Sequence, residues 1–202
     1  MNKYLLYKMK YINLKKQIGS SNVESAELEH MTQNKTYKGD INGEGEIYYD
    51  NILHYKGQLR NGKRHGNGTS YYVMERIQYK GDWVNNMKHG KGKLYTANLT
   101  ESKGKLAYDG NWVNDMRDGY GISYAYGLEL KEYDGFWQAG KKNGKGKFYK
   151  ISFAKWNKPA TSYLMYDGNW INDRREGHGI SYNIEGKIEY DGNWIGDMMI
   201  SK

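Results

Sequence analysis

Aromatic residues and glycines alternate with polar residues along this chain, and the clearest stretch is YKGDWVNNMKHGKGKLY, residues 79–95. The alternating positions are Tyr79, Gly81 and Trp83, followed by Gly90, Gly92 and Leu94. Side chains two residues apart on a β-strand share one face of the sheet. The pattern therefore predicts two strands, each with one face made of aromatic side chains and glycines.

The five residues 85–89 between these strands are polar and turn-like, so the unit reads as strand, turn, strand. Glycine suits such a face because an aromatic ring can lie flat across a neighbouring strand only where a side chain is missing. A lone hairpin of this size is marginal in water. We therefore expect several hairpins to stack and bury one continuous aromatic row.

The same frame starts five times, at Tyr55, Tyr79, Tyr108, Tyr133 and Tyr166. In each copy the first tyrosine precedes the first glycine of Gly-x-Gly by the same interval, which is the signature of a repeat protein. Leu59 stands in the tryptophan position of the first full copy. Shortened copies begin at residues 37 and 190. The connections between copies vary in length, so insertions are expected along one rim of the sheet and the turns along the other.

These residues resemble the MORN repeat (membrane occupation and recognition nexus), with the pattern Tyr-x-Gly-x-Trp-x-x-Gly-x-x-x-Gly-x-Gly-x-x-x-Tyr, over residues 37–194. The resemblance implies an all-β fold, an elongated single-layer antiparallel sheet of stacked β-hairpins. Gly62 and Gly140 match the middle glycine, whereas Asn86, Asp115 and Asp173 replace it elsewhere, so we expect turn geometry to differ between copies. The expected repeat core is Tyr55, Gly57, Tyr79, Gly81, Trp83, Gly90, Gly92, Tyr108, Gly110, Trp112, Gly119, Gly121, Tyr133, Gly135, Trp137, Gly144, Gly146, Tyr166, Gly168, Trp170, Gly177, Gly179, Tyr190, Gly192 and Trp194.

The chain divides into residues 1–18, a polar linker 19–36 and the repeat array 37–202. Apolar residues of the first segment recur every three or four positions among lysines, which predicts a short basic amphipathic helix. This helix could pack on the array, remain unstructured, self-associate or bind a membrane surface. The segment also resembles the opening of many giant DNA virus proteins, which implies a viral origin and a place in the host cytoplasm or the virion.

Composition narrows the function classes. The net charge of +8 favours acidic partners: anionic lipid, nucleic acid or an acidic protein surface. Nucleic acid is disfavoured because the regular tyrosines and tryptophans are needed by the sheet and are not free to stack on bases. The chain has no cysteine, no apolar run long enough to span a membrane, and no good secretory signal.

We expect no catalytic residue, metal or cofactor. His65 and His89 occupy equivalent positions about 10 Å apart, too far to share one metal ion. An open sheet face also offers no pocket that would shift the pKa of a carboxylate pair. The position after the frame tyrosine changes from lysine in early copies to aspartate in later ones, which suggests either a solvated face or two chains paired antiparallel.

The sequence therefore predicts a non-catalytic repeat scaffold that binds a protein partner of unknown identity. MORN proteins are similar in often forming dimers near their C-terminal copies, which makes a homodimer an expectation. The alternative function is peripheral binding to anionic lipid through residues 1–18 and the basic turns. Candidate partner or lipid contacts are Lys63, Arg64, Lys88, Arg117, Lys141, Lys142, Arg174, Arg175 and Trp156.

Overall fold

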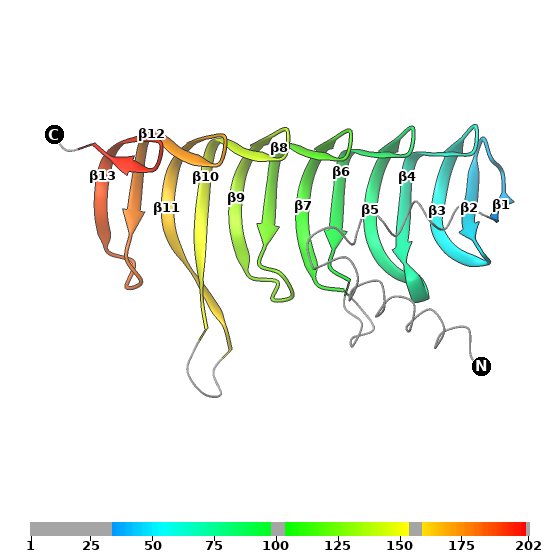
Figure 1. Ribbon diagram of the computed structural model, residues 1–202, viewed down its shortest axis with the longest axis horizontal. Helices are drawn as coiled ribbons and strands as arrows, with labels where there is room; N and C mark the ends of the chain where they lie inside the picture. The colour runs from blue at the N-terminus through cyan, green and yellow to red at the C-terminus, as the bar shows by residue number, and fades with distance from the viewer. Residues whose placement is uncertain (1–33, 98–103, 154–158, 201–202) are drawn as a thin grey trace, which may run out of the picture.

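The computed structural model describes residues 34–97, 104–153 and 159–200. These residues form one open, fourteen-stranded antiparallel sheet in which each strand is hydrogen-bonded to the next in chain order (Figure 1). The strands are β1 (Lys35–Gly39), β2 (Glu44–Tyr49), β3 (Ile52–Arg60), β4 (Lys63–Tyr72), β5 (Arg76–Val84), β6 (Met87–Tyr95), β7 (Leu106–Val113), β8 (Met116–Tyr124), β9 (Lys131–Gln138), β10 (Lys141–Ser152), β11 (Thr161–Ile171), β12 (Arg174–Tyr182), β13 (Ile188–Ile195) and β14 (Met198–Met199), with a 3-10 turn, η1 (Val73–Glu75), before β5.

The all-β, single-layer antiparallel sheet predicted from the sequence is confirmed. Strand β1 begins at Lys35, two residues before the predicted start of the array at residue 37. The helix predicted for residues 1–18 and most of the predicted linker 19–36 lie outside the described residues.

The hairpin turns are shorter than predicted. Strand β6 already begins at Met87, so the turn is only Asn85–Asn86, and the predicted five-residue turn is wrong. Both turn residues have positive φ, +50° and +74°, as in the two-residue turns that match strand twist. Ala139 and Gly140 take nearly the same values, +47° and +83°. The predicted difference in turn geometry is therefore also wrong, because Asn and Asp enter the left-handed region more readily than other non-glycine residues.

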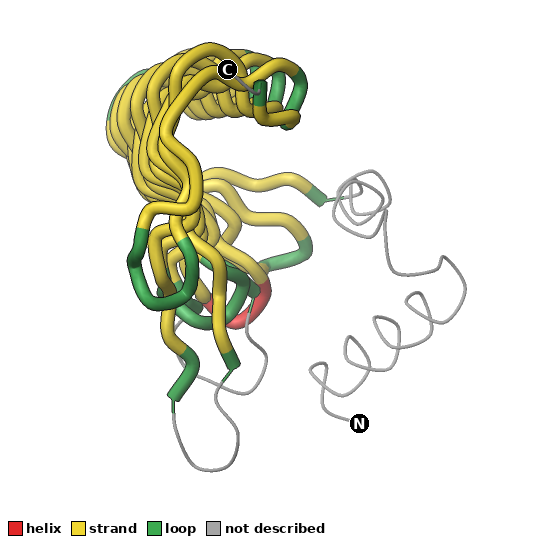
Figure 2. Tube along the Cα trace, turned by 90° about the vertical axis from the view of Figure 1, so that its left-hand side faces the viewer, coloured by secondary structure: helices red, strands yellow, loops and turns green. Residues whose placement is uncertain are grey.

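A β-bulge bends every full hairpin at the first glycine of Gly-x-Gly. Gly90 and Gly119, for example, have φ of +57° and +90°. The strand register shifts beside them, between Gly81 and Asp82 and between Gly110 and Trp112. An extra residue in one strand sharpens the local bend. Because the bulge recurs in every copy, the whole sheet curls into an arch along its turn side (Figure 2).

Each frame tyrosine lies over bare backbone on the inner side of this arch. The Tyr108 hydroxyl donates a hydrogen bond to the carbonyl of Asn111 at 3.1 Å. Its ring lies against Gly121, where an added Cβ would come within 2.1 Å of the hydroxyl oxygen. Tyr108 is fully buried although the sheet has only one layer.

Each frame tryptophan joins its hairpin to the preceding one. The Trp112 indole nitrogen donates to the carbonyl of Gly92 at 3.2 Å, and its ring meets Tyr79 and Tyr108 edge to face, at 5.6 and 5.0 Å between centroids. The same bond to the second glycine of the preceding copy is made by Trp83, Trp137, Trp170 and Trp194. The rings thus form one continuous row from Tyr55 to Tyr190.

Substituting Gly121 with alanine is expected to lower the free energy of unfolding by about 2–3 kcal/mol, because the new methyl group overlaps the Tyr108 ring. Urea unfolding would measure the loss. Tyr108→Leu should lower the free energy of unfolding by itself. In a Tyr108→Leu background, however, Gly121→Ala should cause a much smaller further loss. Fully additive effects in this cycle would contradict the contact.

Candidate interaction surface along the turn rim

The two long edges of the curled sheet differ. The turns within the full hairpins follow one another along one edge, and the connections between successive full hairpins lie along the other, as the sequence predicts (Figure 1). We call the first edge the turn rim: the turns 61–62, 85–86, 114–115, 139–140, 172–173 and 196–197, together with the residue on either side of each turn. Every candidate cation is the first or second residue after one of these turns.

Five of these cations point inward onto the aromatic row. Arg64 lies over the Trp83 ring at 4.2 Å and Arg175 over the Trp194 ring at 4.0 Å. Lys88, Arg117 and Lys142 cover the next tryptophans in the same way. Burial lowers the pKa of Arg64 and Arg117 from the usual arginine value, although arginine stays charged at neutral pH. These five side chains therefore close the aromatic core through cation–π contacts.

Neighbouring turns are hydrogen-bonded to one another. The Asp115 carboxylate accepts from the Lys88 backbone N–H at 2.9 Å, and the Asp115 N–H donates to the Lys88 carbonyl at 3.0 Å. Asn86, Asp173 and Asp197 make the same pair of bonds to Arg64, Lys142 and Arg175. This bonding explains why Asn or Asp replaces the middle glycine of the repeat pattern in these copies.

Gly140 occupies the same turn position and has no side chain to complete this ladder. Its N–H still donates to the Arg117 carbonyl at 2.9 Å, and no atom lies within 4 Å of an added Cβ. Both Gly140→Asp and Gly140→Ala carry the strain of a side chain at positive φ, and we expect the aspartate variant to be about 0.5–1.5 kcal/mol more stable than the alanine variant because its carboxylate accepts a bond from the Arg117 N–H. Thermal unfolding would test this. Gly140→Ala, which lacks the acceptor, is the matched control, and equal effects of the two substitutions would argue against the bond.

The outward side of the rim carries the remaining candidate cations and a row of exposed apolar side chains. Lys63, Lys141 and Arg174 are exposed and make no ion pair with any other described residue. The exposed apolar residues on this side of the rim are Val113, Met116, Ile171, Ile195 and Met198, with exposed fractions from 38% to 66%. Candidate Trp156 lies outside the described residues.

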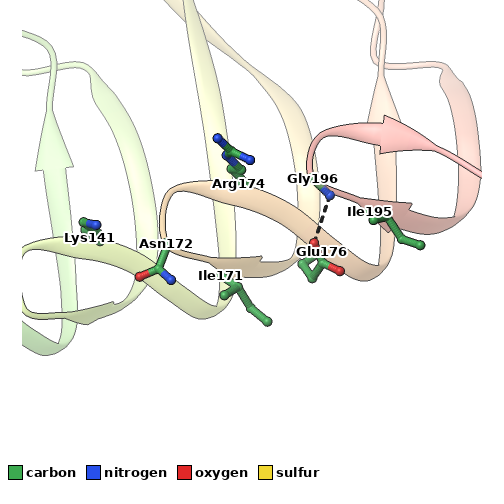
Figure 3. Close-up of a pocket in the computed structure, with 7 residues that line it drawn as sticks. All are labelled: Lys141, Ile171, Asn172, Arg174, Glu176, Ile195 and Gly196. Carbon is green, nitrogen blue, oxygen red and sulfur yellow. Dashed lines mark hydrogen bonds between the residues drawn. The ribbon is translucent and has the colours of Figure 1, made fainter.

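A shallow groove of about 540 Å³ opens on this rim over the last three turns (Figure 3). It is lined by Lys141, Ile171, Asn172, Arg174, Glu176, Ile195 and Gly196. The Glu176 carboxylate accepts a hydrogen bond from the Gly196 N–H at 2.9 Å, which fixes one wall. The two cations remain available to a partner.

The position after each frame tyrosine, which changes from lysine in early copies to aspartate in later ones, lies on the outer face of the sheet. The aspartates of this column form ion pairs within the chain: Asp109 with Lys93 at 3.0 Å, and Asp167 with Lys147 at 3.4 Å. The Asp134 carboxylate is engaged by Lys131 at 2.8 Å and by the Tyr120 hydroxyl. These pairs reduce the charge that this column could offer to a second chain.

Sequence reasoning missed the outward apolar residues of the rim. The signal was present, because the residue after each frame tryptophan is aliphatic at Val84, Val113, Ile171 and Ile195. Alternation places that residue on the face opposite the tryptophan. Because a five-residue turn was expected directly after it, this position was not recognised as the exposed end of a strand.

Within residues 34–97, 104–153 and 159–200, no group of three or more His, Asp or Glu side chains is placed to hold a metal ion. The same residues include no helix with the length and apolar character needed to cross a membrane.

Stacked β-hairpins locked by inward tryptophans define a hairpin-repeat protein. The family model for the MORN repeat matches residues 55–74, 79–100, 108–124, 133–152 and 166–182, so the chain contains five MORN repeats. MORN repeats are generally linked to protein or membrane-lipid interactions. No curated protein sequence matches the chain.

Proposed function

We propose that this chain is a non-catalytic scaffold that binds a protein partner along the outward side of its turn rim. One observation carries the proposal: Val113, Met116, Ile171, Ile195 and Met198 expose apolar surface at positions flanking successive turns, with Gln138, Lys141 and Arg174 between them, while the tyrosines and tryptophans of the aromatic row are largely buried. Exposed apolar surface with polar neighbours is typical of interaction sites. A rigid, bonded row of turns holds these side chains in fixed register.

Affinity capture from native cells with a rim variant tests this function. The variant Val113→Ser, Met116→Ser, Ile171→Ser removes exposed apolar surface without touching the aromatic row. The matched control, Tyr126→Ser with Ile184→Ser, removes two exposed apolar side chains, 78% and 65% exposed, from connections on the opposite edge. We expect a partner to be retained by the wild type and the control but lost by the rim variant. Retention by all three would overturn the proposal.

Peripheral binding to anionic lipid is the second candidate, favoured by the free cations Lys63, Lys141 and Arg174 beside exposed aliphatic residues. Each cation near an anionic bilayer contributes roughly 1 kcal/mol. Sedimentation with phosphatidylserine vesicles should show salt-sensitive binding that reversing these three charges abolishes, while Lys80→Glu on the outer face leaves it intact. A chain lacking residues 1–18 tests their predicted contribution to lipid binding. Absence of binding at low salt would remove this candidate.

A homodimer joined near the C-terminal copies remains a proposal. Met198 and Met199 on the last described strand are 66% and 52% exposed, which leaves apolar surface for a second copy. Light scattering at high protein concentration tests it, and a monomer there would exclude it. The viral origin suggested by residues 1–18 also stays a prediction.

A further inference from the structure

Two aromatic side chains outside the repeat frame lie next to each other on the outer face of the sheet. Tyr120 on β8 and Phe136 on β9 are direct cross-strand partners, with ring centroids 5.7 Å apart. Their chain neighbours Gly121 and Trp137 belong to the inner face, so alternation places both rings outside. The two rings are 47% and 50% exposed, and their strands lie near the middle of the array (Figure 1).

The fold does not require this pair, because the other full hairpins carry polar residues at both positions. The residue inside Gly-x-Gly, where Tyr120 stands, is asparagine, lysine or histidine elsewhere. The residue before the frame tryptophan, where Phe136 stands, is asparagine or aspartate elsewhere. The Tyr120 hydroxyl also donates a hydrogen bond to the Asp134 carboxylate, which holds its ring in place. The outer face thus presents a fixed pair of half-exposed rings.

Exposed lysines lie on either side of the pair. Lys91 is on β6, two strands from β8, and Lys145 is on β10, next to β9. Each stands between two glycines of a Gly-x-Gly and faces outward like Tyr120. Both are exposed and make no ion pair with any other described residue. Two carboxylates on this face are already bonded, Asp134 to the Lys131 ammonium and Asp82 to the Lys91 N–H.

Rings and free cations together select the class of ligand. A single-stranded nucleic acid offers a base with open π-faces and a phosphate at every step. An acidic peptide supplies the charge without a ring at each residue, and a double helix keeps its base faces inside the stack. Exposed aromatic side chains on a β-sheet are how other nucleic-acid-binding sheets stack two or three bases. The frame tyrosines are buried and cannot do this, but Tyr120 and Phe136 lie outside the frame.

We propose that the outer face over β6 to β10 binds single-stranded nucleic acid. Neighbouring bases stack on Tyr120 and Phe136, and phosphates on either side contact Lys91 and Lys145. Four strand spacings cover about 19 Å, and single-strand sites on other folds take roughly 4–16 nucleotides. This activity goes beyond the proposed function, because it uses the outer face and not the turn rim.

Fluorescence anisotropy with the full chain and a dye-labelled oligothymidylate or oligouridylate of about twelve nucleotides tests the proposal. We expect both strands to bind, and more weakly as salt rises, because phosphate contacts release counterions. Tyr120→Asn with Phe136→Asn should weaken binding at least tenfold without changing the salt dependence. Asparagine already stands at the equivalent positions Asn67 and Asn111, so the fold should tolerate both changes. Tyr126→Asn, at a 78% exposed position, is the control for the rings.

The lysines should show a different signature. Lys91→Gln with Lys145→Gln should reduce the slope of log K against log salt by about 1.4, since each phosphate contact on a single strand contributes roughly 0.7. Lys63→Gln with Lys141→Gln removes two exposed cations from the turn rim and should leave the slope unchanged. Damage to the fold would not separate affinity from salt dependence in this way.

Equal affinity of the wild type and the ring variant would overturn the inference. So would a duplex bound as tightly as the single strand, or a slope that falls only with the rim lysines. It would also fall if neither strand binds at low salt while the ring variant loses a protein captured from native cells, since the pair would then belong to a protein interface. The proposed function fails separately: there, the serine variant of the rim keeps the captured partner.

Discussion

Replacing Trp112 with alanine is expected to lower the free energy of unfolding by about 3–5 kcal/mol, the usual cost of removing a large buried aromatic side chain. The residue is 3% exposed, and its indole contacts Tyr79 and Tyr108 while bonding the Gly92 carbonyl. Lys88, 4.9 Å above the ring, loses its cation–π partner as well. Calorimetry and chemical unfolding would measure the effect.

The repeat architecture predicts a second effect of removing Trp112. Contacts in a repeat array connect mainly nearest neighbours, so stability is a sum of units and their interfaces. Trp112 lies at one such interface in the middle of the row. Its loss should split a single unfolding transition into two, for the hairpins before and after it. Val113→Ala alters the adjacent outward residue and is the control. A single transition in the Trp112 variant would mean that other contacts couple the two halves.

The fold could be predicted from local rules alone. Alternation at Tyr79, Gly81 and Trp83 defines a strand face, and the glycines show where a ring can cross the next strand. Because hairpins pair only with their neighbours in the chain, the strand order follows from the sequence order. No long-range pairing had to be guessed.

The rim was harder to predict because it depends on one residue of strand register. Asn61-Gly62 is a strong signal for a two-residue hairpin turn, and applying it to every copy would have placed the adjacent cations correctly. Lys63 and Arg64 are neighbours, yet one faces solvent and the other covers Trp83. Composition alone treats the two as equivalent, and only the register separates a core residue from a surface residue.

The cation that covers each tryptophan varies with the residue six positions later on the same strand. It is arginine where that residue is serine, and lysine where that residue is large and apolar. The combinations are Arg64 with Ser70, Arg117 with Ser123, Arg175 with Ser181, Lys88 with Leu94 and Lys142 with Phe148. The Lys142 ammonium lies 4.8 Å from the Phe148 ring centre, so the two side chains share one space. We infer that the larger guanidinium is accommodated where that later residue is small.

Raising the pH above about 10 is expected to unfold this protein, because its buried phenols resist ionisation. Burial raises the pKa of Tyr166 to about 12, and it also raises the pKa values of Tyr55, Tyr79, Tyr108 and Tyr133. An unfolded tyrosine has a pKa of about 10. The stability linked to these raised values is therefore complete below pH ~10 and declines above it, where the unfolded chain releases protons that the folded chain retains.

Each such tyrosine contributes roughly 1.4 kcal/mol of lost stability per pH unit above its unfolded pKa. Five in one array should together remove more than ~5 kcal/mol by pH ~11. Urea unfolding at stepped pH, followed by circular dichroism and tyrosinate absorbance, should show ionisation and loss of the sheet in one cooperative step. Tyr166→Phe should flatten the decline, whereas Tyr126→Phe, at a 78% exposed position, should not. Ionisation of all tyrosines near pH ~10 with the sheet intact would contradict the burial of this row.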